Sequence, residues 1–182
     1  MRLFCDIDGV LADFVGGAAK ILNYDPAVVT TWDYYPLIGT TEKAFWAAID
    51  EAGSDYWANL EAYSWADELD FLCKNYDERY VLLTSPSKCP SSHHGKMRWM
   101  ASRYGKGFRN YLIGPRKEYC AREGSVLIDD SDANCEKFKA HGGKAIVFPQ
   151  PWNKNAHIPA SERLLYVSRQ LQAIDAEIAS CS

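Results

Sequence analysis

The sequence predicts an α/β fold, in which a Rossmann-like parallel sheet is flanked by helices and a small helical cap is inserted after the first strand. Three observations predict it. Short apolar runs alternate with helical patterns along most of the chain, as they do in parallel sheets covered by helices. One much longer stretch separates the first apolar run from the second, and a pair of aspartates follows both the first and the fourth run.

Five apolar runs have the length and composition of buried strands. Each is short and is followed by turn-forming or charged residues. They span residues 3–7, 80–84, 111–113, 126–128 and 144–148. Because helical patterns lie between successive runs, we expect crossover connections and parallel strands.

Three segments have helical patterns. Residues 94–104 and 133–141 lie between predicted strands, and Ser131 or Asp132 is the expected cap of the second helix. Two glycines at positions 142 and 143 end that helix. Near the C-terminus, apolar residues at alternating three- and four-residue steps predict one amphipathic helix that packs on the sheet. These residues are Leu164, Val167, Leu171, Ile174 and Ile178.

The stretch from residue 14 to residue 75 is far longer than an ordinary connection between two strands. Its pattern is mostly helical, with breaks at Pro26, at residues 36–39 and at Gly53. We therefore predict a helical cap over residues 14–75 and assign residues 1–13 and 76–182 to the α/β core. A chain of 182 residues has room for one core and such an insertion, but hardly for a second independent core.

The composition is that of a globular protein, with 47% hydrophobic and 24% charged residues and a net charge of −4. This charge is the opposite of what non-specific binding to nucleic acid or to anionic membranes requires. The N-terminus has no signal-peptide pattern, and no stretch approaches a membrane-spanning length. We expect a cytoplasmic protein that acts on a small molecule, without nucleic-acid or membrane partners.

The strongest chemical signal follows the first predicted strand, where Asp6 and Asp8 precede Gly9. Residues i and i+2 of a strand point to the same side, so two carboxylates gather where the strand ends. Ligands of open parallel sheets bind beyond the carboxyl ends of the strands. The pattern therefore predicts a binding site here, although an ordinary Asp-Gly turn explains these residues when they are taken alone.

A second acidic pair, Asp129 and Asp130, follows the fourth predicted strand. If the first and fourth strands are parallel neighbours, the two pairs converge and repel each other unless a cation lies between them. Carboxylate oxygens favour a hard ion, so we predict Mg²⁺. The second pair is also suited to capping a helix. A zinc site at Cys89, His93 and His94 is a disfavoured alternative, because no second ligand pair stands at a useful spacing, and we expect a polar loop there.

Two further elements complete a site for phosphoryl transfer. The strand at residues 80–84 ends in Thr84, and Ser85 follows it. The two hydroxyls can hold phosphate oxygens together with nearby backbone amides. Lys117, ahead of the fourth strand, can supply positive charge to the same oxygens and to Asp6. Its neighbour Arg116 is the competing candidate.

In this order the motifs resemble those of the haloacid dehalogenase (HAD) superfamily of phosphatases. The four matching motifs are D-x-D-G-x at residues 6–10, Thr84 with Ser85, Lys117, and Asp129 with Asp130. Within the superfamily, the sequence is most similar to the 5'(3')-deoxyribonucleotidases. That similarity rests on Ala12, Asp13, Phe14, residues 85–87, Lys96, Trp99, residues 127–130 and residues 148–153.

The resemblance implies Mg²⁺-dependent hydrolysis of a phosphate monoester through an aspartyl-phosphate intermediate. Asp6 is implied as the nucleophile. Asp8 is implied as the group that protonates the departing oxygen and later activates water. Mg²⁺ is implied to bind the Asp6 carboxylate, the Asp8 backbone carbonyl and Asp130, with Asp129 behind these direct ligands.

Four of the six tryptophans lie in the predicted cap, namely Trp32, Trp46, Trp57 and Trp65. Aromatic rings over a phosphate site can stack on a nucleobase, although a small cap also needs large side chains for its own core. Tyr56 and Trp57 match aromatic positions of the resembling family, so we predict that they contact the base. The expected substrate is a nucleoside monophosphate, preferably a deoxyribonucleotide.

Other functions compete with this prediction. The same chemistry suits another small phosphate ester, such as a sugar phosphate. A non-catalytic metal-binding module of the same fold is a second alternative. A phosphatase for nucleic-acid ends is a third, which the negative net charge disfavours. The sequence does not decide the oligomeric state, and a homodimer is one option.

Overall fold

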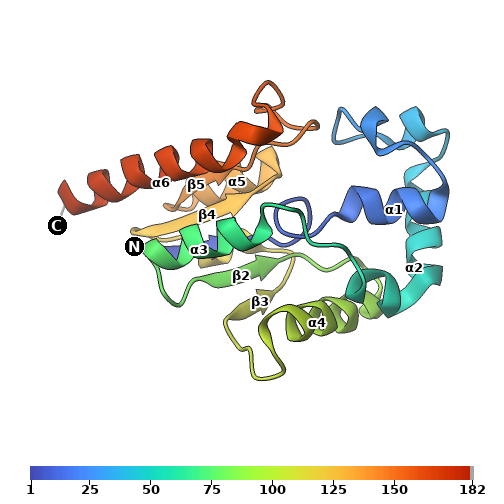
Figure 1. Ribbon diagram of the computed structural model, residues 1–182, viewed down its shortest axis with the longest axis horizontal. Coiled ribbons are helices and arrows are strands. Elements are labelled where there is room, and N and C mark those ends of the chain that lie inside the picture. Colours follow the sequence, from blue (N-terminus) through green and yellow to red (C-terminus); the bar gives the residue numbers. More distant parts are fainter. Residues whose placement is uncertain (181–182) are drawn as a thin grey trace.

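The central feature of the fold is a five-stranded sheet with the strand order β3-β2-β1-β4-β5 (Figure 1). The computed structural model describes residues 1–180. The strands are β1 (Arg2–Cys5), β2 (Val81–Thr84), β3 (Tyr111–Ile113), β4 (Ser125–Asp129) and β5 (Lys144–Val147). All neighbouring strands are parallel, so the predicted α/β fold with a parallel sheet is confirmed. β1 lies in the middle, between β2 and β4.

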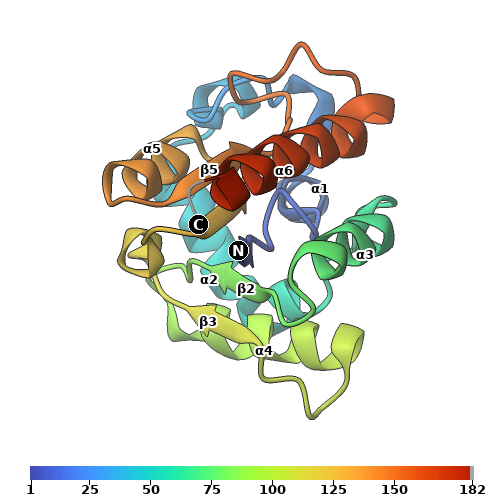
Figure 2. The same ribbon diagram turned by 90° about the vertical axis from the view of Figure 1, so that its left-hand side faces the viewer.

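Helices connect the strands and surround the sheet (Figure 2). The α-helices are α1 (Phe14–Leu22), α2 (Glu42–Ala58), α3 (Ala66–Tyr76), α4 (Pro90–Tyr104), α5 (Asp132–Ala140) and α6 (Arg163–Ser180). Short 3-10 helices lie in the connections, namely η1 (Pro26–Val28), η2 (Tyr35–Ile38), η3 (Lys117–Cys120) and η4 (Ala160–Glu162). Among residues 1–180, no helix combines the length and apolar character needed to cross a membrane.

Alternate side chains of the strands pack on opposite faces of the sheet, as the pleat of a strand requires. Phe4 of β1 packs edge-on against Phe138 of α5, with ring centroids 6.1 Å apart. Leu3, its neighbour in β1, belongs instead to the larger core that contains Val167 of α6. The two central strands β1 and β4 are therefore buried on both faces, which explains why their interior residues are apolar.

The predicted helices form near their predicted positions. Ser131 caps α5, and its hydroxyl oxygen accepts a hydrogen bond from the Asn134 amide at 3.3 Å. α4 begins at Pro90, one turn before the predicted start, because proline is well suited to the first turn of a helix. α6 contains the predicted apolar repeat, of which Val167 and Leu171 are fully buried.

The long segment between β1 and β2 has two parts. α1, η1, η2 and α2 lie beyond the carboxyl ends of the strands (Figure 1). α3 lies beside the sheet, where it packs against α6, and its Asp70 accepts a hydrogen bond from Tyr80, just ahead of β2. The division of the chain at residues 13 and 75 stays a prediction, but α3 packs with elements of the core.

α2 lies very close to α4 at Gly95. A Cβ atom on Gly95 would lie 2.4 Å from Trp57 Cβ and 2.5 Å from the Ser54 carbonyl oxygen. Any larger residue would therefore push the two helices apart. Gly53, with a φ of +68°, interrupts the regular backbone of α2 just before this contact. The close approach holds residues 14–58, which form the inserted segment, against α4 of the core.

Candidate active site

A cavity of about 770 Å³ lies where the inserted segment meets the core. This volume is within the range of small-molecule sites. The core contributes a polar wall that includes Asp6, Asp8, Ser85, Lys117 and Asp130. The inserted segment contributes an aromatic wall made of Phe14, Trp32, Tyr34, Tyr35, Trp46 and Trp57. The cavity thus combines charged groups with rings that can contact the apolar part of a ligand.

The turn after β1 brings Asp6 and Asp8 to this cavity. The Asp6 amide donates to the Ile128 carbonyl of β4 at 2.9 Å, which continues the pairing of the two strands. Gly9 has a φ of +73°, and a Cβ atom there would lie 2.2 Å from Asp130 Oδ2. Only glycine therefore allows the turn to pass beside Asp130.

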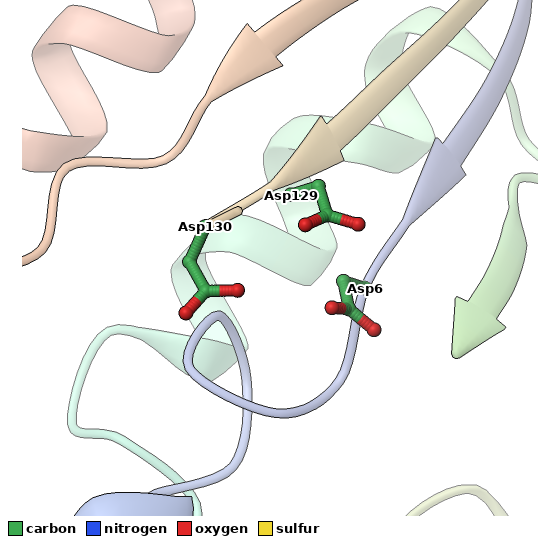
Figure 3. A group of neighbouring side chains, drawn as sticks. All are labelled: Asp6, Asp129 and Asp130. Carbon is green, nitrogen blue, oxygen red and sulfur yellow. The ribbon is translucent and has the colours of Figure 1, made fainter. Parts of the chain in front are cut away.

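Three aspartates lie close together at the ends of two strands (Figure 3), and two of them, Asp6 and Asp130, line the cavity. Asp6 follows β1, whereas Asp129 ends β4 and Asp130 follows it. β1 and β4 are parallel neighbours with Cys5 opposite Ile128, so their acidic ends adjoin as the sequence predicts. One carboxylate oxygen of each aspartate lies within 4.8 Å of the others.

Lys117 supplies positive charge to this acidic cluster. Its Nζ lies 2.7 Å from Asp6 Oδ2 and 2.6 Å from Asp129 Oδ2, and its side chain is 2% exposed. Arg116, the competing candidate, has a side chain that is 59% exposed and pairs with Glu118. The structure therefore brings Lys117, and not Arg116, against Asp6.

Burial and like charge act together on the acidic cluster. Burial raises the pKa of Asp129 to about 6, against the opposing effect of Lys117. Burial also raises the pKa of Asp130 well above its usual range, and the charges of Asp129 and Asp6 raise it further. Burial alone would lower the pKa of Lys117, but Asp129 and Asp6 raise it above its usual value. One lysine does not balance three clustered acids.

The acidic cluster fits a divalent cation. Its donors are carboxylate oxygens, which hard cations such as Mg²⁺ prefer. A cation there would also relieve the repulsion that Asp130 experiences. Among the residues that the structure describes, this cluster is the only group of three or more potential ligands that lie close enough to share an ion. Cys89, His93 and His94 form no such group. The zinc alternative is therefore not supported.

Asp8 is paired with a different buried lysine, Lys96 of α4. Lys96 Nζ donates hydrogen bonds to Asp8 Oδ2 and, at 3.0 Å, to Thr84 Oγ1. The same Nζ lies 4.8 Å from the centre of the Trp57 ring. Burial raises the pKa of Asp8, and the Lys96 charge opposes that rise. Asp6 and Asp8 thus line one cavity but have separate cationic partners.

The sequence prediction gave Lys96 no role in the site. A signal was nevertheless present, because Lys96 shares a helix face with Ser92, Trp99 and Met100, and all four are buried. A lysine on a buried helix face needs a charged or polar partner. The partner itself, Asp8, lies 88 residues away in the chain, so helix periodicity does not identify it.

The two hydroxyl residues at the end of β2 have different environments. Ser85 lines the cavity. Thr84 is fully buried, and its hydroxyl oxygen accepts the hydrogen bond from Lys96. The structure brings Ser85 to the cavity wall but leaves Thr84 behind it.

The two aromatic residues predicted to contact a base also differ. Trp57 lines the cavity, whereas Tyr56 is not part of its wall. The Tyr56 ring packs edge-on against Phe14, and its hydroxyl donates to the Phe14 carbonyl at 3.0 Å. Trp57 is 2% exposed, and Trp46 on the same wall is only partly buried. Trp57 and Trp46 therefore lie where they could contact a base. Tyr56 packs behind the cavity wall, against Phe14.

The loop after β5 fixes Asp130 and the turn at Gly9. Trp152 Nε1 donates to Asp130 Oδ2 at 2.8 Å, and Asn153 Nδ2 donates to the Asp130 carbonyl at 2.8 Å. The Gln150 side chain donates to the Gly9 carbonyl. These residues contribute to the family resemblance, but the sequence prediction assigned them no role. Their function as supports becomes visible only in the folded loop.

Solved structures share this fold. A HAD family hydrolase of Deinococcus radiodurans R1, determined with bound phosphate and sodium, is 14% identical and has a TM-score of 0.57 over 98% of this chain and 96% of that chain. A hydrolase of Streptococcus pneumoniae TIGR4 is 13% identical and has a TM-score of 0.50 over 82% of this chain and 92% of that chain. The chain therefore shares its fold with a hydrolase of the HAD family.

Sequence comparison identifies the family within this class. Residues 1–169 match the model of the family described as "5' nucleotidase, deoxy (Pyrimidine), cytosolic type C protein". The chain belongs to this family and is a nucleotidase, a hydrolase of phosphoric monoesters. A Staphylococcus epidermidis protein provisionally named a 5'(3')-deoxyribonucleotidase is 26% identical over 168 residues, which cover 86% of this chain and 87% of that protein. The predicted superfamily and nucleotidase family are confirmed.

Proposed function

We propose that this nucleotidase hydrolyses nucleoside monophosphates, with a preference for deoxyribonucleotides, in a Mg²⁺-dependent reaction through an aspartyl-phosphate intermediate. The observation that carries the proposal is the Asp6 carboxylate, which belongs to the acidic cluster, lines the cavity and lies 2.7 Å from Lys117 Nζ. The preference for deoxyribonucleotides rests on the family description and on the name of the S. epidermidis relative.

Asp6 is the nucleophile of the proposed reaction. The Ile7 amide donates to its Oδ1 at 2.8 Å, and Lys117 Nζ lies 2.7 Å from its Oδ2, so the carboxylate is held in one orientation. In the first step a carboxylate oxygen forms a bond to phosphorus as the bond between phosphorus and the ester oxygen breaks. Asp8 gives a proton to the departing oxygen, which leaves as the hydroxyl of the nucleoside.

Water completes the proposed reaction. Asp8, now deprotonated, takes a proton from a water molecule as the water oxygen attacks phosphorus. The bond between phosphorus and the Asp6 oxygen breaks, and inorganic phosphate leaves. Asp6 is a carboxylate again, and Asp8 again carries the proton for the next substrate.

The proposed Mg²⁺ ligands are the Asp6 carboxylate, the Asp8 backbone carbonyl and the Asp130 carboxylate. When bound, Mg²⁺ neutralises charge on the phosphoryl oxygens and orients them. Asp129 pairs with Lys117 and orients that lysine toward Asp6. Lys117 and the cavity-wall hydroxyl of Ser85 are the proposed protein contacts to the phosphoryl oxygens, while the buried Thr84 supports the site indirectly.

The purified protein is expected to release phosphate from deoxyribonucleoside monophosphates when Mg²⁺ is present. This phosphate release should stop when EDTA removes the metal. The reason is that the clustered acids need a cation before an anionic phosphate can approach them. The measurement is phosphate release from a panel of deoxyribonucleotides, ribonucleotides and sugar phosphates. Restored activity after excess Mg²⁺ controls for other effects of EDTA. Turnover that persists in EDTA, or that is confined to sugar phosphates, would contradict the proposal.

Trp46→Leu is expected to raise KM for a deoxyribonucleoside monophosphate about 5- to 150-fold, because stacking on an aromatic ring contributes about 1–3 kcal/mol per base. KM for glycerol phosphate, which has no base, should change little. Trp46 is the sharper test, because Trp57 also contacts Lys96. Tyr56→Phe keeps the ring off the cavity wall and is the matched control, which should leave both KM values unchanged. An equal rise for the two esters would contradict base stacking.

A further inference from the structure

We propose that Lys96 is a positioning residue that holds the Asp8 carboxylate in place for proton transfer, a role that rests on the proposed function. Lys96 lies on α4, the helix that packs closely against α2. Its Nζ contacts Asp8 after β1, Thr84 at the end of β2 and the ring of Trp57 on α2. One buried ammonium group therefore joins three separate elements around the candidate acid and base.

Lys96 acts on a substrate only through other residues. The side chain is 1% exposed and is not part of the cavity wall. Two of its three contacts, Asp8 and Trp57, do line the cavity. Lys96 therefore differs from Lys117, which lines the cavity itself and pairs with Asp6.

The orientation of Asp8 depends on this contact. Throughout residues 1–180, Lys96 Nζ is the hydrogen-bond partner of the Asp8 carboxylate, and the second oxygen, Oδ1, is buried without a partner. Hydrogen bonds between an ammonium group and a carboxylate are strong and directional. Thr84 Oγ1, 3.0 Å from Nζ, holds the ammonium group in turn. Without Lys96 the carboxylate loses its donor, and the fraction of time that it spends in the geometry for proton transfer falls.

Lys117 does not replace Lys96. Its Nζ is already bound between Asp6 and Asp129, at 2.7 Å and 2.6 Å. The two lysines thus have divided roles, in which Lys117 orients the nucleophile and Lys96 orients the acid and base. The division predicts that the Lys96 contact affects the reaction most where a proton has to be delivered to the leaving group.

Lys96→Met is expected to lower kcat for a deoxyribonucleoside monophosphate by about 100-fold or more, the usual contribution of a positioned acid and base. KM should stay within about 3-fold, because Lys96 does not touch the substrate. For p-nitrophenyl phosphate, whose leaving group departs without a proton, the first-turnover rate of nitrophenolate release should fall by less than about 10-fold. A purely structural role would lower the rates for both esters by the same factor.

Three further variants isolate the contact. Lys96→Arg keeps a charged donor that can lie against the Trp57 ring, and it should recover part of the lost kcat. In an Asp8→Asn background, Lys96→Met should cause no further loss, because the two residues act as one unit. Lys106→Met, at an exposed position after α4, should keep the activity of the unaltered protein. Thermal unfolding verifies that each variant is folded, and Lys96→Gln, which is too short to keep the same contact, serves if Lys96→Met does not fold.

Two sets of outcomes are distinguishable. Equal losses for the two esters, an additive loss in the Asp8→Asn background, or a rise in KM at constant kcat would overturn the role of Lys96 while leaving the nucleotidase reaction intact. An unaltered protein that hydrolyses neither ester in the presence of Mg²⁺ would overturn the proposed function, and the inference about Lys96 with it.

Discussion

Asp6→Asn is expected to lower kcat for nucleotide hydrolysis by at least about 10⁴-fold, because an amide does not attack phosphorus as a carboxylate does. Asparagine has nearly the same shape, and its carbonyl oxygen can still accept the hydrogen bond that the Ile7 amide donates to Asp6. The site should therefore keep its geometry while it loses its nucleophile. Steady-state phosphate release at saturating nucleotide and Mg²⁺ measures the effect.

The stability of this variant separates loss of chemistry from loss of fold. Asp6 shares a small volume with Asp129 and Asp130, so removing its charge relieves repulsion. Lys117 keeps Asp129 as a partner at 2.6 Å. Tm without Mg²⁺ should therefore stay the same or rise. Asp175→Asn, at an exposed position on α6, is the control and should retain full activity. A folded Asp6→Asn protein with more than about 1% of the original kcat would show that another group attacks phosphorus.

Lys117→Met is expected to lower kcat by about 10²- to 10³-fold, the usual effect of removing one positive or hydrogen-bonding group from a transition-state site. It should also lower the free energy of unfolding by about 3–5 kcal/mol, because it leaves buried acids without their cationic partner. Lys117 is 2% exposed and contacts both Asp6 and Asp129. Nucleotide hydrolysis and denaturant unfolding at neutral pH measure the two effects. Added Mg²⁺ should restore part of the stability, since it also supplies positive charge.

Arg116→Met is the matched control for this prediction. It removes one positive charge from the adjacent residue, but the Arg116 side chain is 59% exposed and pairs with Glu118 rather than with the acidic cluster. Exposed ion pairs contribute little to stability, so activity and unfolding should stay close to those of the unaltered protein. A large loss of activity in Arg116→Met, together with unchanged activity and stability in Lys117→Met, would show that Arg116 and not Lys117 is the cation of the site.

The strands are predictable from the sequence because the apolar pattern of a buried strand is contained within a few consecutive residues. All five residues of β4 are buried. Its three central residues are apolar, as expected for a strand that is buried on both faces. Turn-forming residues such as Gly142 then mark where the next element begins. Capping is local too, which is why Ser131 could be identified as a candidate cap of α5 before its hydrogen bond to Asn134 was seen.

The convergence of the acids is predictable for a related reason. Parallel strands end at the same edge of a sheet, so Asp6 and Asp129 lie close together if β1 and β4 are neighbours. The sequence contains the aspartates at the strand ends, but strand order depends on long-range pairing between residues such as Cys5 and Ile128. The prediction of an oxygen-rich cation site therefore required one assumption about topology.

Side-chain direction outside the strands was decided by tertiary structure. Arg116 and Lys117 are adjacent, and the short helix η3 turns one toward solvent and the other toward Asp6. Tyr56 and Trp57 are also adjacent, and the packing of α2 on α4 and α1 leaves only Trp57 on the cavity wall.

Lys96 is the clearest example of a side-chain contact that only the tertiary structure decides. Its burial agrees with the apolar face of α4, but its contact with Asp8 joins residues 88 positions apart. The sequence was sufficient for the strands, the acids that follow them and the class of chemistry, because periodicity and composition express these features over a few residues. The pairing of each acid with its own lysine was decided only when α2, α4 and η3 packed around the strand ends, because such pairing depends on distances that are set by the whole fold.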